Sequence, residues 1–177
     1  MNFKNTKKAF ETFAALVVQQ ARNNLTRKNK NASGDLFKSL GHRLNVGKNS
    51  IELEFFMEDY GMFQDQGVRG SLSTYRESQN SKFSFTNKRP PAKPLEKWLK
   101  LKRFQFRDKQ GKFMSYKNMS YIIANSMFKK GIKASLFFTK PFEDAFLKLP
   151  EEIIQKFALD IDDLFDFSVD DPIKRNE

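Results

Sequence analysis

The sequence predicts an α+β fold in which a long N-terminal helix and a second central helix pack on a small antiparallel sheet. Apolar residues recur at helical spacing over Lys4–Arg27 and again over Ser115–Lys130. Between them, Ile51–Met57 alternates apolar and polar residues, as a half-buried strand does. The length of 177 residues fits one domain. We expect an α+β domain over residues 1–150 with an exposed arm at 71–89, followed by an acidic C-terminal helix and tail over 151–177.

The first helix is predicted from one apolar stripe along Lys4–Arg27. Its members fall at spacings of three and four: Phe10, Phe13, Ala14, Val17, Val18, Ala21 and Leu25. A polar run rich in Asn, Ser and Lys then ends the periodicity. A short helix is expected over Leu36–Leu40, with Ser33 or Asp35 as its cap and Gly41 as its end.

A hairpin and a compact aromatic turn follow. Leu44–Val46 and Ile51–Met57 flank a polar Gly47–Ser50 loop that is typical of an antiparallel hairpin. The second strand runs into Tyr60–Gly70, where glycines alternate with aromatic residues. Because this turn offers aromatic surface and no obvious catalytic group, three of its residues are candidates for an oligomer or partner interface: Tyr60, Phe63 and Asp65.

The stretch Ser71–Arg89 is predicted to be an exposed arm. It is dominated by Ser, Thr, Asn, Gln, Lys and Arg, which cannot build a core, and it is a type of segment that a partner often orders. Its aromatic residues are interface candidates: Tyr75, Phe83 and Phe85. Its basic residues are the candidates for lying near DNA: Lys82, Lys88 and Arg89.

A proline-rich link leads into a helix over Leu95–Leu101, in which Trp98 is expected to anchor the core. The basic, aromatic segment Lys100–Lys112 has two interpretations. Its cations could meet phosphates while Phe104 or Phe106 stacks on bases. Alternatively, the segment forms two edge strands joined by a polar turn, with cations that prevent edge pairing. Further on, a helix is expected from Pro141 to Leu147, and a last amphipathic helix over Glu151–Phe165.

Charge is distributed unevenly along the chain. Residues 1–150 contain 29 Lys and Arg against 12 Asp and Glu, a net charge of +17, whereas residues 151–171 contain eight acids against Lys156 alone, a net charge of −7. This asymmetry fits a basic surface that faces nucleic acid, or head-to-tail association of an acidic end with a neighbour's basic body. A lysine-rich surface without a specific partner also fits. In the acidic helix, Asp160 and Asp163 share a face and are interface candidates.

The residue inventory argues against most enzymes. There is no cysteine and only one histidine, and no phosphate-binding glycine loop, zinc-protease motif or nucleophile-elbow motif occurs. We therefore expect no catalytic, metal-binding or cofactor-binding residue and no small-molecule substrate. A metal-dependent nuclease built on Asp160 and Asp163 is the weakest alternative. The longest apolar run, Phe13–Val18, falls short of the roughly 20 residues of a membrane span, so no membrane partner is expected.

Several short motifs together resemble tailed-phage neck, head–tail joining and tail-completion proteins. After the long helix come Ser-Gly-Asp-Leu-Phe-Lys-Ser-Leu (33–40), a hairpin, Tyr-Gly-Met-Phe-Gln-Asp-Gln-Gly-Val (60–68) and Lys-Pro-Phe-Glu-Asp-Ala-Phe (140–146). The family's stretches look like Thr-Gly-x-Leu-x-x-Ser-Ile, Tyr-Ala-x-x-x-Glu-x-Gly-Thr and Pro-Phe-Leu-x-Pro-Ala. Here Asp65 stands in place of Glu, Val68 in place of Thr and Gly61 in place of Ala.

The resemblance covers roughly residues 9–69 and 120–147. It extends to enlarged versions in phages of Bacteroidetes-type hosts, in which Tyr-Lys-x-x-x-x-x-Ile-Ala precedes Lys-Gly-Ile-Lys and Phe-Phe-Thr-Lys-Pro-Phe, as in residues 116–142 here. It implies a structural subunit of the virion that forms a homo-oligomeric ring through which DNA passes. Implied partners are portal, adaptor or tail proteins, with transient nonspecific contact to DNA. The implied location is the virion, and the host cytoplasm during assembly. The alternative is a sequence-nonspecific nucleic-acid-binding protein that works alone.

Overall fold

The structure is a computed structural model that describes residues 3–47 and 50–170, with side chains up to residue 162. Its elements in chain order are α1 (Lys4–Arg27), α2 (Asp35–Ser39), β1 (Gly41–Val46), β2 (Ile51–Phe56), α3 (Gly61–Gln66), β3 (Val68–Arg69), the 3₁₀ turn η1 (Arg76–Ser78), α4 (Ala92–Lys102), α5 (Tyr116–Lys130), β4 (Gly131–Ile132), α6 (Thr139–Phe146) and α7 (Leu149–Asp170). Helices combined with two small antiparallel sheets make the fold α+β, as the sequence predicts.

Helix α1 is the element on which the core is built. Its apolar stripe is buried along its whole length, and it contributes to two clusters. One cluster joins α1 to the short helix α2 and to Phe137, and the other joins it to the start of α7 through Leu149. Removing a Leu or Phe side chain from water stabilises a fold by about 1.5–3 kcal/mol, so this one stripe holds three distant parts of the chain together.

The hairpin β1–β2 lies against α1 through the inward face of β2. Leu44 pairs with Leu53 in an antiparallel register, and the burial of β2 alternates residue by residue. Phe55 packs edge-on against Phe13 of α1, and against Phe142 of α6 with ring centroids 5.8 Å apart. The backbone N–H of Gly47 donates to the carbonyl of Ser50 at 2.8 Å, while the predicted turn residues Lys48 and Asn49 lie outside the described residues.

The second helix on the hairpin is α6, not the central helix that the sequence suggested. Phe138 and Phe142 pack on Phe55 beside Phe13 of α1, on the same inward face of the hairpin. The central helix α5 packs instead on α4 and on the short strand β4. The periodicity of α5 correctly predicted a helix, but periodicity does not specify which surface that helix covers.

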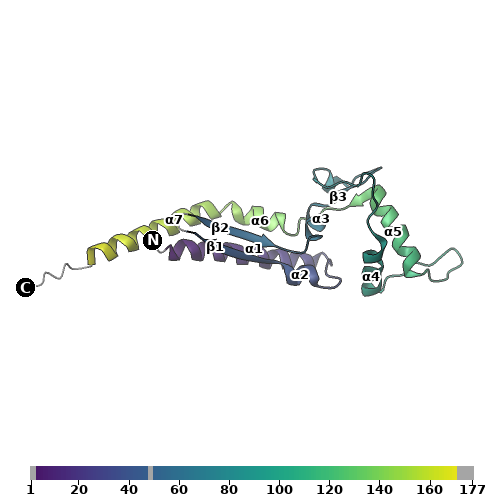
Figure 1. The fold of residues 1–177 in the computed structure, drawn as a ribbon, viewed down its shortest axis with the longest axis horizontal. Coiled ribbons are helices and arrows are strands. Elements are labelled where there is room, and N and C mark those ends of the chain that lie inside the picture. The colour runs from purple at the N-terminus through teal and green to yellow at the C-terminus, as the bar shows by residue number, and fades with distance from the viewer. Residues whose placement is uncertain (1–2, 48–49, 171–177) are drawn as a thin grey trace, which may run out of the picture.

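Residues 70–130 form a separate unit, which we call the lobe; the rest of the described chain is the body. The chain leaves the body through β3 and returns through β4, and these strands pair with each other, Val68 with Ile132 and Arg69 with Gly131. We call this strand pair the neck. Figure 1 shows α4 and α5 at one end of an elongated molecule, beyond the neck.

Gly131 makes the tight approach of strands in the neck possible. It has φ +84°, and a Cβ at this position would collide with the backbone carbonyl of Val68. Gly67, at φ +73°, is confined in the same way by Ser78 and the backbone of Ile132. Both positions therefore need glycine for backbone angle and for space.

Helix α7 returns along α1 and does not stand apart as an appendage. Leu149 and Ile153 pack into the α1 cluster, and Phe157 stacks on Phe3 with ring centroids 5.7 Å apart. Pro150 lies in the first turn of α7, where a missing N–H is tolerated, so the helix begins two residues before the predicted Glu151. The far end of α7 extends past the start of α1, at the opposite end of the molecule from the lobe (Figure 1).

Candidate interaction surfaces

The lobe has a small interior and a large apolar exterior. Its buried apolar side chains among the described residues are Leu99, Met119 and Ala124. Nine large apolar side chains of the lobe are exposed: Leu72, Tyr75, Trp98, Leu101, Phe104, Phe106, Phe113, Tyr121 and Ile122. Exposed apolar side chains that gather into a large patch mark a place where another molecule binds.

Trp98 is part of this surface, so the expectation that it anchors the core was wrong. Helix α4 turns Leu95, Leu99 and Lys102 inward at spacings of four and three, and Leu99 is fully buried against α5. Trp98 and Leu101 lie off that stripe and are 40% and 48% exposed. The sequence offered apolar residues around most of α4, so their order could not tell which of them face α5.

A short hairpin between α4 and α5 projects from the end of the lobe (Figure 1). Arg107 and Phe113 face each other across an antiparallel bridge, and the Arg107 guanidinium lies over the Phe113 ring at 4.0 Å. The Asp108 carboxylate accepts from the backbone N–H groups of Gln110 and Lys112 and so orders the tip. This is the arrangement of two edge segments and a polar turn that one interpretation of Lys100–Lys112 predicted.

The helices and hairpin of the lobe are strongly basic. Residues 92–130 contain 11 Lys and Arg against two acids, Glu96 and Asp108. Three of the cations are already bound within the chain. Lys100 pairs with Glu96 at 2.7 Å, and Arg107 donates to the Gly111 carbonyl at 2.7 Å. The Lys102 ammonium donates to the Asn29 side chain at 3.0 Å and to the Asn31 carbonyl at 3.1 Å, and so joins the lobe to the loop after α1. The other cations of this stretch are exposed: Lys93, Lys97, Arg103, Lys109, Lys112, Lys117, Lys129 and Lys130.

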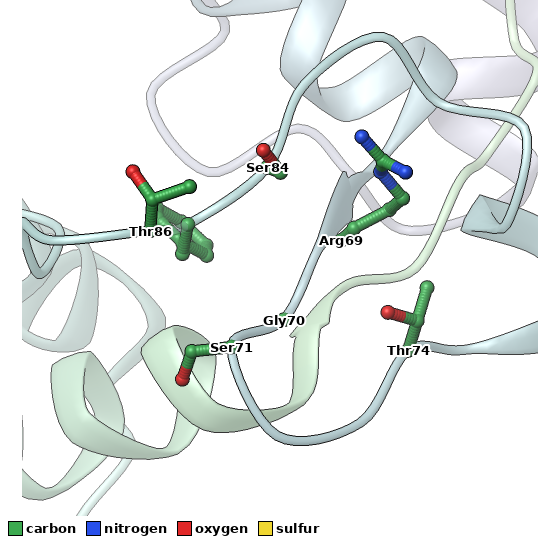
Figure 2. Close-up of a pocket in the computed structure, with 7 residues that line it drawn as sticks. Arg69, Gly70, Ser71, Thr74, Ser84 and Thr86 are labelled. Carbon is green, nitrogen blue, oxygen red and sulfur yellow. The ribbon is translucent and has the colours of Figure 1, made fainter.

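A shallow, open depression of about 360 Å³ lies beside the neck. Figure 2 shows Arg69 and Thr74 on one side of the Arg69–Gly70 backbone and Ser84 and Thr86 on the other. The hydroxyls and the guanidinium do not converge on one point, so the depression has no geometry suited to catalysis or to a tightly held small ligand.

The segment Ser71–Arg89 is exposed over most of its length, as predicted, but it is folded onto the neck and does not protrude. Ser78 is fully buried; its hydroxyl donates to the carbonyl of Ile132 at 2.7 Å and accepts from the N–H of Ala134. The Ser81 hydroxyl donates to the Gly67 carbonyl, and the Arg69 N–H donates to the carbonyl of Phe83. Polar composition suggested exposure, but these serines bond to backbone groups and hold the segment down.

The aromatic interface candidates are divided between contacts within the chain and solvent. Phe83 lies edge-on against Phe63 of α3 with centroids 4.6 Å apart, and Phe85 lies near Phe128 of α5. Phe63 remains 40% exposed, and Tyr60 and Tyr75 are exposed to a similar degree. Partial burial raises the pKa of the Tyr60 hydroxyl, opposed by its hydrogen bond with the Leu36 backbone, so Tyr60 also contacts α2.

Asp65 has a structural role within the chain, which corrects its assignment to an interface. It is 1% exposed, and its carboxylate accepts from the backbone N–H groups of Phe138 and Thr139 and from the Thr139 hydroxyl. These groups begin α6, where orphan N–H donors and the helix dipole favour an anion. Asp65 therefore fixes the start of α6 to α3.

Asp160 plays the same part at the start of α1, which corrects its assignment as well. Its carboxylate accepts from the N–H groups of Asn5 and Thr6, both at 2.8 Å, and from the Thr6 hydroxyl. Burial would raise the pKa of Asp160, but these hydrogen bonds outweigh it and the pKa lies below its ordinary value. The side chain of Asp163 lies outside the described residues.

The candidates for lying near DNA are all on the surface. Lys82, Lys88 and Arg89 are exposed on the segment that follows η1, and the structure does not gather them with the cations of the hairpin into a defined site. Among the described residues, no group of three or more His, Cys, Asp or Glu side chains could hold a metal ion. Within the same described part of the chain, no helix is long and apolar enough to cross a membrane.

Comparison of the chain with protein-family models, curated proteins and solved structures gave no match.

Proposed function

We propose that this chain is a structural subunit of a phage head–tail junction, a neck or tail-completion protein that forms a homo-oligomeric ring through which DNA passes. One observation carries the proposal. The three short motifs that resemble the family, residues 33–40, 60–68 and 140–146, lie far apart in the sequence and meet in one part of the body.

Two contacts join these motifs. Gly61 lies so close to Leu36 of α2 that a Cβ at Gly61 would collide with the Leu36 side chain. Asp65, four residues later, binds Thr139, the residue immediately before the third motif. Short motifs that match by chance have no reason to touch, whereas motifs that specify one shared structural unit do. Their contact supports a family relationship beyond the resemblance of the letters.

The position of the lobe supports the same proposal. Residues 71–114 exceed the compact family pattern, and they belong to the unit that the neck closes off from the body. An enlarged member of the family would carry such an addition without disturbing the shared part. We expect the partners to be other copies of the chain and portal, adaptor or tail proteins, with no small molecule, cofactor or catalytic step. The location is the virion, and the host cytoplasm during assembly.

The proposal is tested on virions of the phage that encodes the chain. We expect peptide quantification to find the chain in a fixed number of copies per particle, and a reconstruction to place it as a ring at the single tail-bearing vertex. A second test is a phage from which the chain is deleted, which should produce DNA-filled heads without tails. Virions that lack the chain, or normal tailed particles made without it, would overturn the proposal.

The basic lobe favours one alternative, a sequence-nonspecific nucleic-acid-binding protein. A conduit must let DNA slide, so we expect duplex DNA to bind the isolated protein weakly and to be released by moderate salt. Each neutralised phosphate steepens the slope of log binding constant against log salt concentration by about 0.9. A titration at two salt concentrations measures this slope. Tight binding that resists salt and is lost on Arg103→Glu with Lys112→Glu would favour the alternative.

A further inference from the structure

The outer side of α7, which we call the acidic face, exposes Glu151, Glu152 and Asp162 beside apolar side chains, and Lys148 and Lys156 are also exposed there. Leu147 is 81% exposed and Ile154 is 69% exposed. Ile154 and Glu151 are three residues apart on one face of α7, and Leu147 lies in the turn between α6 and α7. Glu152, Leu159 and Asp162 are exposed beside them. The inward side of α7 is occupied by α1, so this acidic face has no partner among the described residues.

The lobe offers the complement of that face. Trp98, Leu101 and Phe113 are exposed there, and cations flank them: Lys97, Arg103, Lys109 and Lys112. Aromatic side chains and arginine are the residues that protein interfaces favour. One surface is apolar and acidic and the other is apolar and basic.

The two faces cannot meet within one chain. Figure 1 places the lobe at one end of the long axis, and α7 runs along the body towards the other end, with α1, the hairpin and the neck between. Any pairing of the two faces must therefore join different copies.

We infer that the lobe of one copy docks on the outer face of α7 of the next copy. Such a contact uses two different surfaces of the same chain, so it is heterologous and repeats from copy to copy, closing a ring where the rotation allows. This contact would join the subunits of the proposed ring, and its biological role rests on that proposed function.

A protein occupant explains the lobe better than DNA does. A duplex backbone would neutralise the cations, but it presents phosphates and sugars and would leave Trp98, Leu101 and Phe113 poorly covered. The α7 face brings carboxylates together with Leu147 and Ile154, so it satisfies both the charge and the apolar area. Removing apolar area from water supplies the main favourable term in association, and charge complementarity sets the orientation.

The test uses three charge-reversed variants of the full chain. The lobe variant carries Lys97→Glu, Lys109→Glu and Lys112→Glu; the α7 variant carries Glu151→Lys, Glu152→Lys and Asp162→Lys. The control carries Glu11→Lys, Glu52→Lys and Asp59→Lys, which reverse three exposed acids elsewhere on the body. Circular dichroism checks that each variant folds, and sedimentation velocity at low salt measures assembly.

We expect the parent and the control to assemble, and each interface variant to associate more than about tenfold more weakly. Mixing the two interface variants should restore assembly, because the intact lobe of one variant meets the intact α7 of the other, and the reversed lobe and the reversed α7 again carry opposite charges. A parent that stays monomeric at every concentration, an interface variant that assembles like the parent, or a mixture that stays monomeric would overturn the inference. A lobe variant that loses only DNA binding would assign the lobe to nucleic acid instead.

A second measurement does not depend on charge. The chain has no cysteine, so L101C and I154C each introduce a single thiol. A short bismaleimide should link L101C of one copy to I154C of another, and a control pair of A158C with S39C should give no product. Absence of the first product in assembled protein would overturn the contact. The presence of the chain in virions is measured separately, so a ring built through other surfaces would overturn this contact and leave the proposed function standing.

Discussion

The body and the lobe are both rich in aromatic residues, but the body buries them and the lobe leaves many of them exposed. In the body, Phe13, Phe55, Phe138 and Phe142 form one contact cluster, and the apolar stripe of α1 is buried. In the lobe, aromatic residues of the same type stay largely in solvent around a small interior centred on Leu99 and Met119. The body therefore has a continuous core, whereas the lobe is joined to it by the neck, by Lys102, by Ser78 and Ser81, and by Phe83 on Phe63. An apolar residue is informative about function when the fold leaves it uncovered.

The largest effect should come from one substitution made in both regions. Leu25 in the body and Leu99 in the lobe are both fully buried, and Leu→Ala at such a site costs about 2–5 kcal/mol. We expect Leu25→Ala to lower the stability of the whole molecule. Leu99→Ala should unfold the lobe and leave the body intact.

The two outcomes can be told apart because the single tryptophan, Trp98, lies in the lobe. During denaturation, Trp98 fluorescence follows the lobe, and circular dichroism follows mainly the longer helices of the body. Coincident transitions in Leu99→Ala would mean that body and lobe unfold as one cooperative unit, and the distinction between them would be wrong.

The next effect concerns the neck. Gly131→Ala places a Cβ against the backbone of Val68 at a positive φ, and strain of this kind costs about 1–3 kcal/mol. We expect faster amide exchange at Val68 and Ile132 and little change in α1. Gly111→Ala is the matched control, because Gly111 also has a positive φ but a Cβ there meets nothing within 4 Å. Equal effects of the two substitutions would show that backbone angle alone matters, without the close approach in the neck.

A similar loss is expected when the carboxylate at the start of α6 is removed. Asp65→Ala leaves the N–H groups of Phe138 and Thr139 without their acceptor, and a hydrogen bond to a charged group contributes about 1.5–3 kcal/mol. Urea unfolding should show this loss in the body. Asp59→Ala, at an exposed site, should change little. If Asp65→Ala instead weakened assembly and left stability unchanged, the original assignment of Asp65 to an interface would be right.

The smallest effect depends on pH. The folded pKa of Asp160 lies below its ordinary value, so its contribution is complete above the unfolded pKa of about 3.9 and is lost as pH falls through the folded pKa. We expect the difference in melting temperature between the parent and Asp160→Asn to shrink as pH falls below about 4. A difference that stays constant from pH 7 to pH 3 would mean that the carboxylate does not hold α7 on α1 through its charge.

The sequence predicted the elements whose evidence is local. Helix α1, the hairpin and the end of α5 at Gly131 follow from periodicity, alternation and a helix stop. Asp65 and Asp160 could not be understood in this way, because their partners lie 73 and 154 positions away and no local pattern predicts which helix end a carboxylate will meet. For the same reason the sequence could not show that the segment 71–89 lies against the neck, because its buried Ser78 bonds to the backbone of Ile132 and Ala134, more than 50 positions away.

Because the chain enters and leaves the lobe at paired residues, the two ends of residues 70–130 are neighbours in space. Opposed residues in an antiparallel pair lie about 5 Å apart, so a two- or three-residue turn could bridge the same gap. The lobe could therefore be removed or replaced at these two points. Its length could change between related proteins while α1, the hairpin and α6 keep their places. Kin of this chain should consequently differ most in size between Gly70 and Lys130, and a chimaera that carries a foreign lobe on this body is a feasible construction.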